Sequence, residues 1–128
     1  MKLTLKQAEK LRLAAEILKA TAHLYDAAKP TLLPHWGGGV ITHGQPKSTS
    51  LIIGISREAQ KAPKDTRTRD HLYRVTQTAE TILVSIQKTP GISISEIEQM
   101  LLDRAVYMVV TKSENSHVFY RSLKMIAE

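Results

Sequence analysis

The 128-residue sequence contains no cysteine. Disulfide bridges, thiolate zinc sites and cysteine nucleophiles are therefore excluded together. The sequence also lacks a long hydrophobic stretch, because its longest uninterrupted apolar run is the six residues Ala105–Val110. A membrane-spanning helix needs about twenty such residues. We therefore expect no membrane-spanning segment and no membrane partner.

The first residues, Met1–Gln7, have neither the apolar stretch nor the small-residue cleavage site of a secretory signal. A cytoplasmic location is the resulting expectation. With 42% hydrophobic and 23% charged residues, the composition is that of a globular protein, which excludes general disorder and fibrous architecture. A chain of this length is expected to form a single domain, residues 1–128, around one core.

Positive charge exceeds negative charge in this sequence. Eighteen Lys and Arg residues against twelve Asp and Glu residues give a formal net charge of +6. Half of the excess lies between Arg57 and Arg74, where six basic residues accompany three acidic ones. Basic residues that neutralise phosphates release counterions and add sequence-independent affinity. The charge therefore favours nucleic acid as a partner, DNA before RNA, with a simply solvated basic surface as the alternative.

The N-terminal third of the chain divides into an expected helix and an expected loop. Thr4 and Gln7 have the spacing of a capping box, in which each side chain satisfies a backbone N–H at a helix start. Apolar residues then recur at helical spacing, which predicts a helix over residues 5–28 (N-terminal segment 1–28). Segment 29–50 is rich in glycine and proline, so it is predicted to be a loop in which only Val40–Thr42 is strand-like.

Residues 51–128 form the expected catalytic or nucleic-acid-binding core. Helical periodicity predicts a helix from Leu72 to Lys88, and two further capping boxes predict a short helix and a last helix that starts at Lys112. β-branched residues predict strands at 51–55 and 106–110. The expected class is α+β, with about four helices and a short β-sheet or hairpin. The two capping boxes pair Ser95 with Glu98 and Thr111 with Glu114.

Histidine accepts a proton most readily near neutral pH, so the five histidines are candidate catalytic residues. His23 and His117 lie in predicted helices, where a lone histidine is more often a surface residue, and they are set aside. His35 and His43 flank Trp36 and three glycines, and they define a second candidate site. Because this run has neither a P-loop ending nor dinucleotide-binding glycine spacing, a mobile loop anchored by tryptophan is the alternative.

His71 follows Asp70 within the most basic segment of the chain. Hydrolysis of a phosphodiester needs an activated water and a divalent cation against the developing negative charge. Hard cations such as Mg²⁺ take oxygen ligands, so a second oxygen donor is expected. Asn115, predicted to project from the apolar face of the last helix, is the candidate. An asparagine that only hydrogen-bonds a neighbouring loop is the alternative.

Asp70-His71, the strand at 106–110 and the string Val110-Thr111-Lys112-Ser113-Glu114-Asn115 together resemble the HNH, or ββα-metal, endonucleases. In that family an Asp-His pair ends one strand, and an Asn follows a second strand near a helix start. The resemblance implies that His71 is the general base and that Asp70 binds Mg²⁺ or Mn²⁺. It also implies that Asn115 is a second ligand or orients His71. The implied phosphate-contacting residues are Arg67, Arg69, Arg74 and Lys112.

The resemblance covers residues 70–121 and departs from the family in two respects. Forty-four positions separate His71 from Asn115, where the compact motif needs only a short hairpin, so two helices have to be inserted between its halves. The last helix also has no second histidine at ligand spacing unless His117 serves.

Two alternatives use the same part of the chain. Residues 82–97 with the strand at 106–110 resemble the first two helices and the wing of a winged helix-turn-helix, a DNA-binding module without catalysis. The predicted strand, however, begins where the recognition helix would lie. The other alternative is a small basic interaction protein, such as a phage inhibitor or assembly factor, that docks on an acidic partner. A homo-oligomer is left open in each case.

Overall fold

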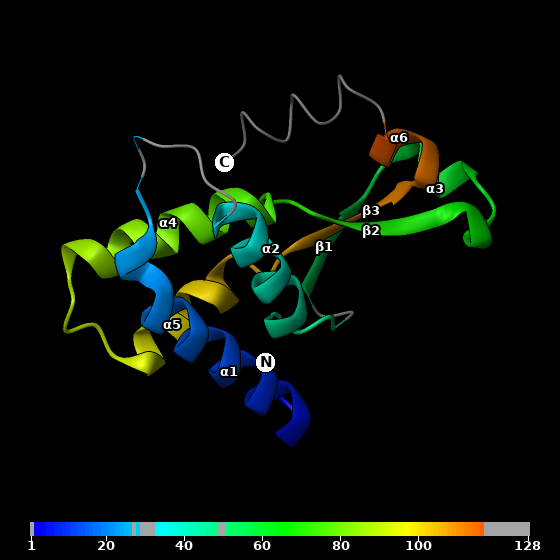
Figure 1. Ribbon diagram of the computed structural model, residues 1–128. Coiled ribbons are helices and arrows are strands. Elements are labelled where there is room, and N and C mark those ends of the chain that lie inside the picture. The colour runs from blue at the N-terminus through cyan, green and yellow to red at the C-terminus, as the bar shows by residue number, and fades with distance from the viewer. Residues whose placement is uncertain (1, 27, 29–32, 49–50, 117–128) are drawn as a thin grey trace. The chain divides into compact units, whose positions relative to one another are not determined.

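The computed structural model describes residues 2–26, 28, 33–48 and 51–116. The chain has the α+β class that the sequence predicted, with helices and one three-stranded sheet (Figure 1). It forms two compact units. Unit 1 comprises Met1–Pro46 and Val75–Arg104, and unit 2 comprises Lys47–Arg74 and Ala105–Glu128. Each unit therefore combines two separate segments of chain, which the expected divisions at residues 28 and 50 do not anticipate.

Helix α1 (Leu5–Thr21) begins at the predicted capping box. Gln7 N donates to Thr4 Oγ1 at 3.1 Å, and Thr4 N donates to Gln7 Oε1 at 2.9 Å. The α-helix ends earlier than predicted, at Thr21, and a 3₁₀ turn, η1 (Ala22–Leu24), follows it. The Thr21 hydroxyl donates to the Ile17 carbonyl at 2.8 Å.

The segment predicted to be a loop is instead helix α2 (Leu33–Gly44). The strand-like residues Val40–Thr42 lie inside this helix, so the predictions of a loop and of a strand were both wrong. Pro34 occupies the first turn, where a missing backbone N–H costs no hydrogen bond. Proline at this position starts the helix instead of breaking it.

Close packing explains two of the glycines of α2, Gly37 and Gly44. Glycine weakens a helix interior by about 1 kcal/mol relative to alanine. An added Cβ at Gly37 would lie 3.0 Å from the Cβ of Ala79, and one at Gly44 would collide with the Cβ of Ala14. The two glycines let α1 and the helix containing Ala79 approach the α2 backbone, and the resulting burial offsets their poor helix propensity.

Helices α4 (Val75–Lys88) and α5 (Ile94–Asp103) complete unit 1. The cap of α5 is Ser93, whose Oγ accepts a hydrogen bond from Glu96 N at 3.1 Å. The predicted cap, Ser95, was two residues too late. Both serines precede a glutamate at the same spacing, so this motif alone does not distinguish the two starts. Ile97, in the first turns of α5, is fully buried.

The core of unit 1 lies between the apolar faces of α1, α2, α4 and α5. Two polar side chains connect distant segments of this core by hydrogen bonds to the backbone. Gln45 Nε2 donates to the Leu101 carbonyl at 2.8 Å, and Lys19 Nζ donates to the Ile92 carbonyl at 2.6 Å. None of the helices in the described part of the chain combines the length and apolar composition needed to cross a bilayer. Fully buried side chains of this core are Ala15, Leu18, Ile41, Ala79, Ile82, Leu83, Ile97 and Leu101.

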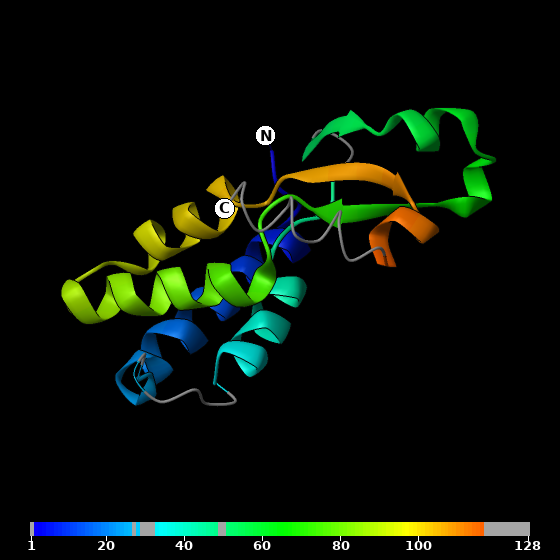
Figure 2. The same cartoon turned by 90° about the horizontal axis from the view of Figure 1, so that it is seen from above.

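Unit 2 contains strands β1 (Ile52–Ile55), β2 (Arg67–His71) and β3 (Tyr107–Thr111) in the order β1-β3-β2. The central strand β3 pairs parallel with β1 and antiparallel with β2, and Figure 2 shows β2 beside β3. The predictions of β1 and β3 are confirmed to within one residue. The residue pattern did not predict β2, whereas the HNH resemblance implied a strand ending in Asp-His.

Short helical segments connect the strands of unit 2. Helix α3 (Arg57–Lys61) and the 3₁₀ turn η3 (Lys64–Thr66) lie between β1 and β2, and neither was predicted. Helix α6 (Lys112–Ser116) begins at the predicted residue, directly after β3. The continuation predicted for this helix beyond Ser116 lies outside the described residues. Because α4 and α5 separate β2 from β3 in the sequence, the two strands pair across the insertion that the resemblance required.

Two matched glycine substitutions test the packing of α2. Gly44→Ala should lower the free energy of unfolding by about 1–3 kcal/mol, because its Cβ overlaps Ala14. Gly39→Ala should raise it by up to about 1 kcal/mol, because its Cβ meets nothing within 4 Å while alanine favours the helix. Urea unfolding followed by circular dichroism measures both changes. Effects of the same sign would contradict the packing account.

Candidate functional site

The junction of β3 and α6 in unit 2 is built by the predicted capping box. Glu114 N donates to Thr111 Oγ1 at 3.0 Å, and Thr111 N donates to Glu114 Oε1 at 3.0 Å. Thr111 is both the last residue of β3 and the cap of α6, so no loop separates the two elements. The prediction of this cap is confirmed. The position of Asn115, one residue after Glu114, is thereby fixed relative to the sheet.

The carboxylate of Glu114 also connects α6 to α3. Ser56 Oγ donates to Glu114 Oε1 at 2.6 Å and accepts from Ala59 N at 3.1 Å, which caps α3. These bonds hold the pKa of the Glu114 carboxyl below its ordinary value, the Ser56 hydroxyl contributing most and the Thr111 backbone N–H next. The sequence analysis missed Ser56. A serine directly before Arg57-Glu58 is a helix-cap signal that would have indicated α3.

Asp70 and Asn115 meet where α6 packs on β2. The Asp70 side chain is 8% exposed. In the amide orientation that satisfies both groups, Asn115 Nδ2 donates to the two Asp70 carboxylate oxygens at 3.1 and 3.2 Å. The residues come together because β2 pairs with β3 and β3 leads directly into α6. The structure thus brings together these two sequence-predicted site residues.

His71 follows Asp70 in β2 and therefore projects from the opposite face of the strand. Its register partner in β3 is Tyr107, and the centroids of the two rings lie 4.8 Å apart with an interplanar angle of 53°. Burial raises the pKa of the Tyr107 hydroxyl, and the positive charge of Arg69 opposes the change. The structure sets His71 on the Tyr107 side of β2 and Asp70 on the Asn115 side. The contact between His71 and Tyr107 was not predicted, because a single sequence does not reveal which residues of two strands are paired.

Asp70 and Asn115 provide the donor types of a hard-cation site. A carboxylate and an amide carbonyl are ligands that Mg²⁺ accepts, and this ion commonly takes one or two protein ligands together with water and substrate phosphate. The facing polar atoms are 3.1–3.2 Å apart, near the spacing of about 3 Å between adjacent oxygens around one octahedral Mg²⁺. The amide would have to turn its oxygen toward the cation. Across the described ranges, no three His, Asp or Glu side chains converge as a metal-binding group. Asp70 and Asn115 would therefore supply two ligands, and water or substrate would supply the others.

The excess positive charge of the chain belongs almost entirely to unit 2. Its two segments contain ten Lys and Arg residues and five Asp and Glu residues, a formal charge of +5 out of +6. Of its four described acidic residues, Asp70 and Glu114 are hydrogen-bonded internally, which leaves Glu58 and Asp65 exposed. Six basic side chains are exposed and, within the described structure, form no ion pair. We call them the basic set: Lys47, Arg57, Lys61, Lys64, Arg69 and Lys112.

The four residues expected to contact phosphate fall into two groups. Arg69 and Lys112 are exposed, whereas Arg67 and Arg74 are half-buried. Arg67 Nη2 donates to the Ala62 carbonyl at 3.0 Å, next to the end of α3. Its guanidinium therefore supports the fold. Arg69 is exposed, with its Nη1 donating to the Lys47 carbonyl at 3.1 Å, and Lys112 is the most available of the four.

The second candidate site does not have the expected loop structure. His35 and His43 both lie in α2, and eight residues of helix separate their Cα atoms by about 12 Å. His43 is exposed, and the side chain of His35 lies outside the described part of the structure. Of the two histidines that were set aside, His23 is exposed in η1 and His117 lies outside the described residues.

Glu114→Gln should destabilise the protein by about 1–2 kcal/mol at pH 7, because a charged hydrogen-bond acceptor is lost. A carboxyl whose pKa falls on folding stabilises the protein above its ordinary pKa of 4.5, and this contribution disappears as the pH falls through the folded-state value. The difference between wild type and variant should therefore shrink in urea unfolding as the pH falls below 4.5. Glu58→Gln, an exposed carboxylate of α3, should change stability by less than about 0.5 kcal/mol at pH 7. A difference that grew at low pH would contradict this assignment.

No protein-family model matches this chain, and no curated protein or solved structure matches it either. Its function is therefore inferred from the geometry of unit 2 and from the resemblance carried by Asp70-His71 and residues 110–115.

Proposed function

We propose that this protein is a metal-dependent endonuclease in which unit 2 binds a nucleic-acid backbone and a divalent cation, Mg²⁺ or Mn²⁺. The observation that carries the proposal is the contact between Asp70 and Asn115, which come from separate segments of the chain. The order of elements also supports it: a strand ending in Asp-His, an antiparallel strand, and a helix with Asn in its first turns. This is the order that the HNH resemblance implies.

In this proposal the Asp70 carboxylate and the Asn115 amide oxygen hold the cation. When bound, the cation would stabilise the negative charge that develops on a phosphate oxygen. The low exposure of Asp70 supports this role, because charges attract more strongly away from bulk water. The Thr111–Glu114 cap supports it too, because a ligand held in place by its own hydrogen-bond network loses little freedom on binding.

The proposed role of His71 is to accept the proton of the attacking water. The resemblance supports this role, and so does the position of His71 beside a metal-ligand candidate at the end of β2. The packing of its ring against Tyr107 does not support it, because the ring lies on the other side of the strand from Asp70. His71 is therefore the residue for which a variant is most informative.

The basic set is proposed to contact the phosphates. Six exposed cations against two exposed carboxylates leave the described part of unit 2 with an unneutralised positive surface. Cations of this kind bind a phosphate backbone with little regard to base sequence. DNA remains the favoured substrate over RNA, as part of the proposal.

The second candidate function is nucleic-acid binding without catalysis, through the same basic set. The observation that favours it is the charge of unit 2, which needs no metal to act. The winged-helix version is less favoured, because β3 begins at Tyr107, only a few residues after α5 ends at Asp103. These few residues leave no room for the recognition helix that would enter the major groove.

Cleavage tests the first candidate. Supercoiled plasmid should be nicked or cut in the presence of Mg²⁺ or Mn²⁺ and remain intact with excess EDTA. Asp70→Asn and Asn115→Ala should lower the cleavage rate by about a hundredfold or more, since each removes a proposed ligand. His71→Ala should abolish cleavage and leave binding unchanged, whereas His23→Ala serves as the exposed-histidine control. Full activity of Asp70→Asn would overturn the proposal, and full activity of His71→Ala would remove only the base.

Salt dependence tests phosphate contact, which both candidates share. The logarithm of the binding constant for duplex DNA should fall linearly with the logarithm of salt concentration. Arg69→Gln and Lys112→Gln should each make that slope shallower by about one unit. Lys2→Gln, an exposed lysine of unit 1, is the matched control and should leave the slope unchanged. Binding that is indifferent to salt would contradict both candidate functions.

A further inference from the structure

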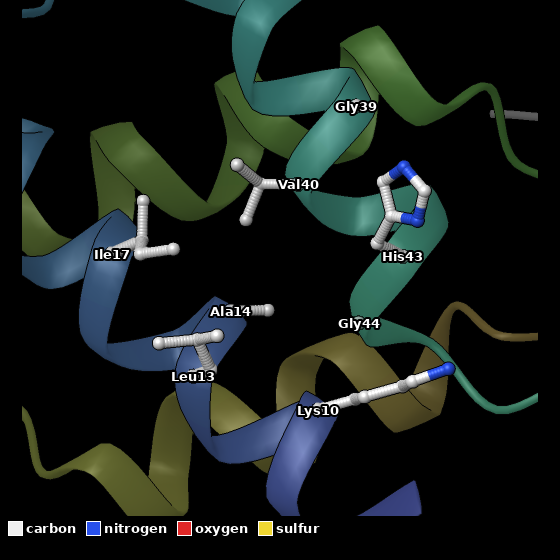
Figure 3. Close-up of a pocket in the computed structure, with 8 residues that line it drawn as sticks. All are labelled: Lys10, Leu13, Ala14, Ile17, Gly39, Val40, His43 and Gly44. Carbon is white, nitrogen blue, oxygen red and sulfur yellow. The ribbon is translucent and has the colours of Figure 1, made fainter.

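Unit 1 contains a groove between α1 and α2 that the proposed nuclease does not use. Its volume is about 400 Å³, within the range of small-molecule sites. Figure 3 shows the side chains of Leu13, Ile17 and Val40 on one side, with the His43 ring and the Lys10 amino group at the other. Its lining residues are Lys10, Leu13, Ala14, Ile17, Gly39, Val40, His43 and Gly44.

Gly39 is the glycine of α2 that internal packing does not explain. A Cβ added at Gly37, Gly38 or Gly44 would meet Ala79, Thr76 or Ala14, whereas one added at Gly39 meets nothing within 4 Å. A glycine inside a helix weakens it, so a glycine with no neighbour to accommodate needs another reason. Gly39 lines the groove, and its lack of a side chain keeps the groove open.

The two ends of the groove differ in chemistry. Leu13 is 57% exposed at one edge, so it presents apolar surface to the groove that it lines together with Ile17 and Val40. Lys10 is exposed, and none of the described carboxylates forms an ion pair with it. The nearest ion pair along α1 joins Arg12 to Glu16 at 3.1 Å, so that carboxylate is already engaged. The groove therefore combines an almost entirely apolar lining with one positive charge at its rim, that of Lys10.

We propose that this groove binds a small amphiphilic anion, a carboxylic acid with an aliphatic tail. The tail would pack against Leu13, Ile17 and Val40, and the carboxylate would lie between Lys10 and His43. Charge complementarity selects an anion, and the limited volume selects a small molecule in preference to a polypeptide helix. The inference is independent of the proposed function, because all lining residues belong to unit 1 and none belongs to the basic set.

Titration of the full chain with decanoate tests the charge requirement. Decanoate below its micelle concentration should shift amide resonances of α1 and α2 in NMR spectra, and decan-1-ol, which has the same tail without charge, should bind about two- to fivefold more weakly. Lys10→Gln should abolish the difference between the two probes, and Lys6→Gln, on the same helix outside the groove, should preserve it. Equal affinity of wild type for both probes, or no binding of decanoate, would overturn the proposal.

Gly39→Leu tests the site itself. Leucine at this position should fill the groove and weaken decanoate binding by about tenfold or more. The melting temperature should rise by roughly 2–6 °C, because leucine is the better helix former, so loss of binding cannot be attributed to unfolding. Gly91→Ala, at an open glycine in the turn before α5, should leave binding unchanged. A folded Gly39→Leu protein with wild-type affinity would overturn the proposal, whatever its activity on DNA.

Discussion

The antiparallel pairing of β2 with β3 is the interaction on which unit 2 depends. Its pairing places His71 opposite Tyr107, although thirty-five residues of sequence lie between them. Closing so long a connection costs entropy, but the cost grows only slowly with length, and the intervening residues are themselves folded as α4 and α5. Once the strands pair, the direct passage from β3 into α6 brings Asn115 to Asp70 without any further loop.

The Glu114 carboxylate gives this arrangement its rigidity. One oxygen accepts hydrogen bonds from Ser56 and from the backbone and hydroxyl of Thr111, so it connects the start of α3, the end of β3 and the start of α6. Side chains held by several bonds lose less freedom when they bind a ligand. The same oxygen therefore supports the position of the neighbouring asparagine, whichever of the two candidate functions applies.

Capping boxes in the sequence located two helix starts correctly, at Thr4–Gln7 and Thr111–Glu114. The third, Ser95–Glu98, was wrong because Ser93 caps α5 with the same spacing to Glu96. Local signals failed where packing decides, because glycines such as Gly37 and Gly44 indicate a loop until their close neighbours are known. Strand β2, Arg-Thr-Arg-Asp-His, has no apolar alternation and was visible only through the family resemblance. The Asp70–Asn115 contact was foreseen, whereas the placement of His71 on the Tyr107 side depends on strand register, which the sequence does not display.

The division of each unit into two stretches of chain constrains how the protein is made. During synthesis, all segments of unit 1 are available once Arg104 has left the ribosome. Unit 2 still lacks its central strand, β3, at that moment. The nascent β1 and β2 then have no partner to pair with and must wait for β3. Unit 1 is thus able to form first. A translation pause after Arg104 would leave the edge strands β1 and β2 unpaired and able to pair with strands of other chains.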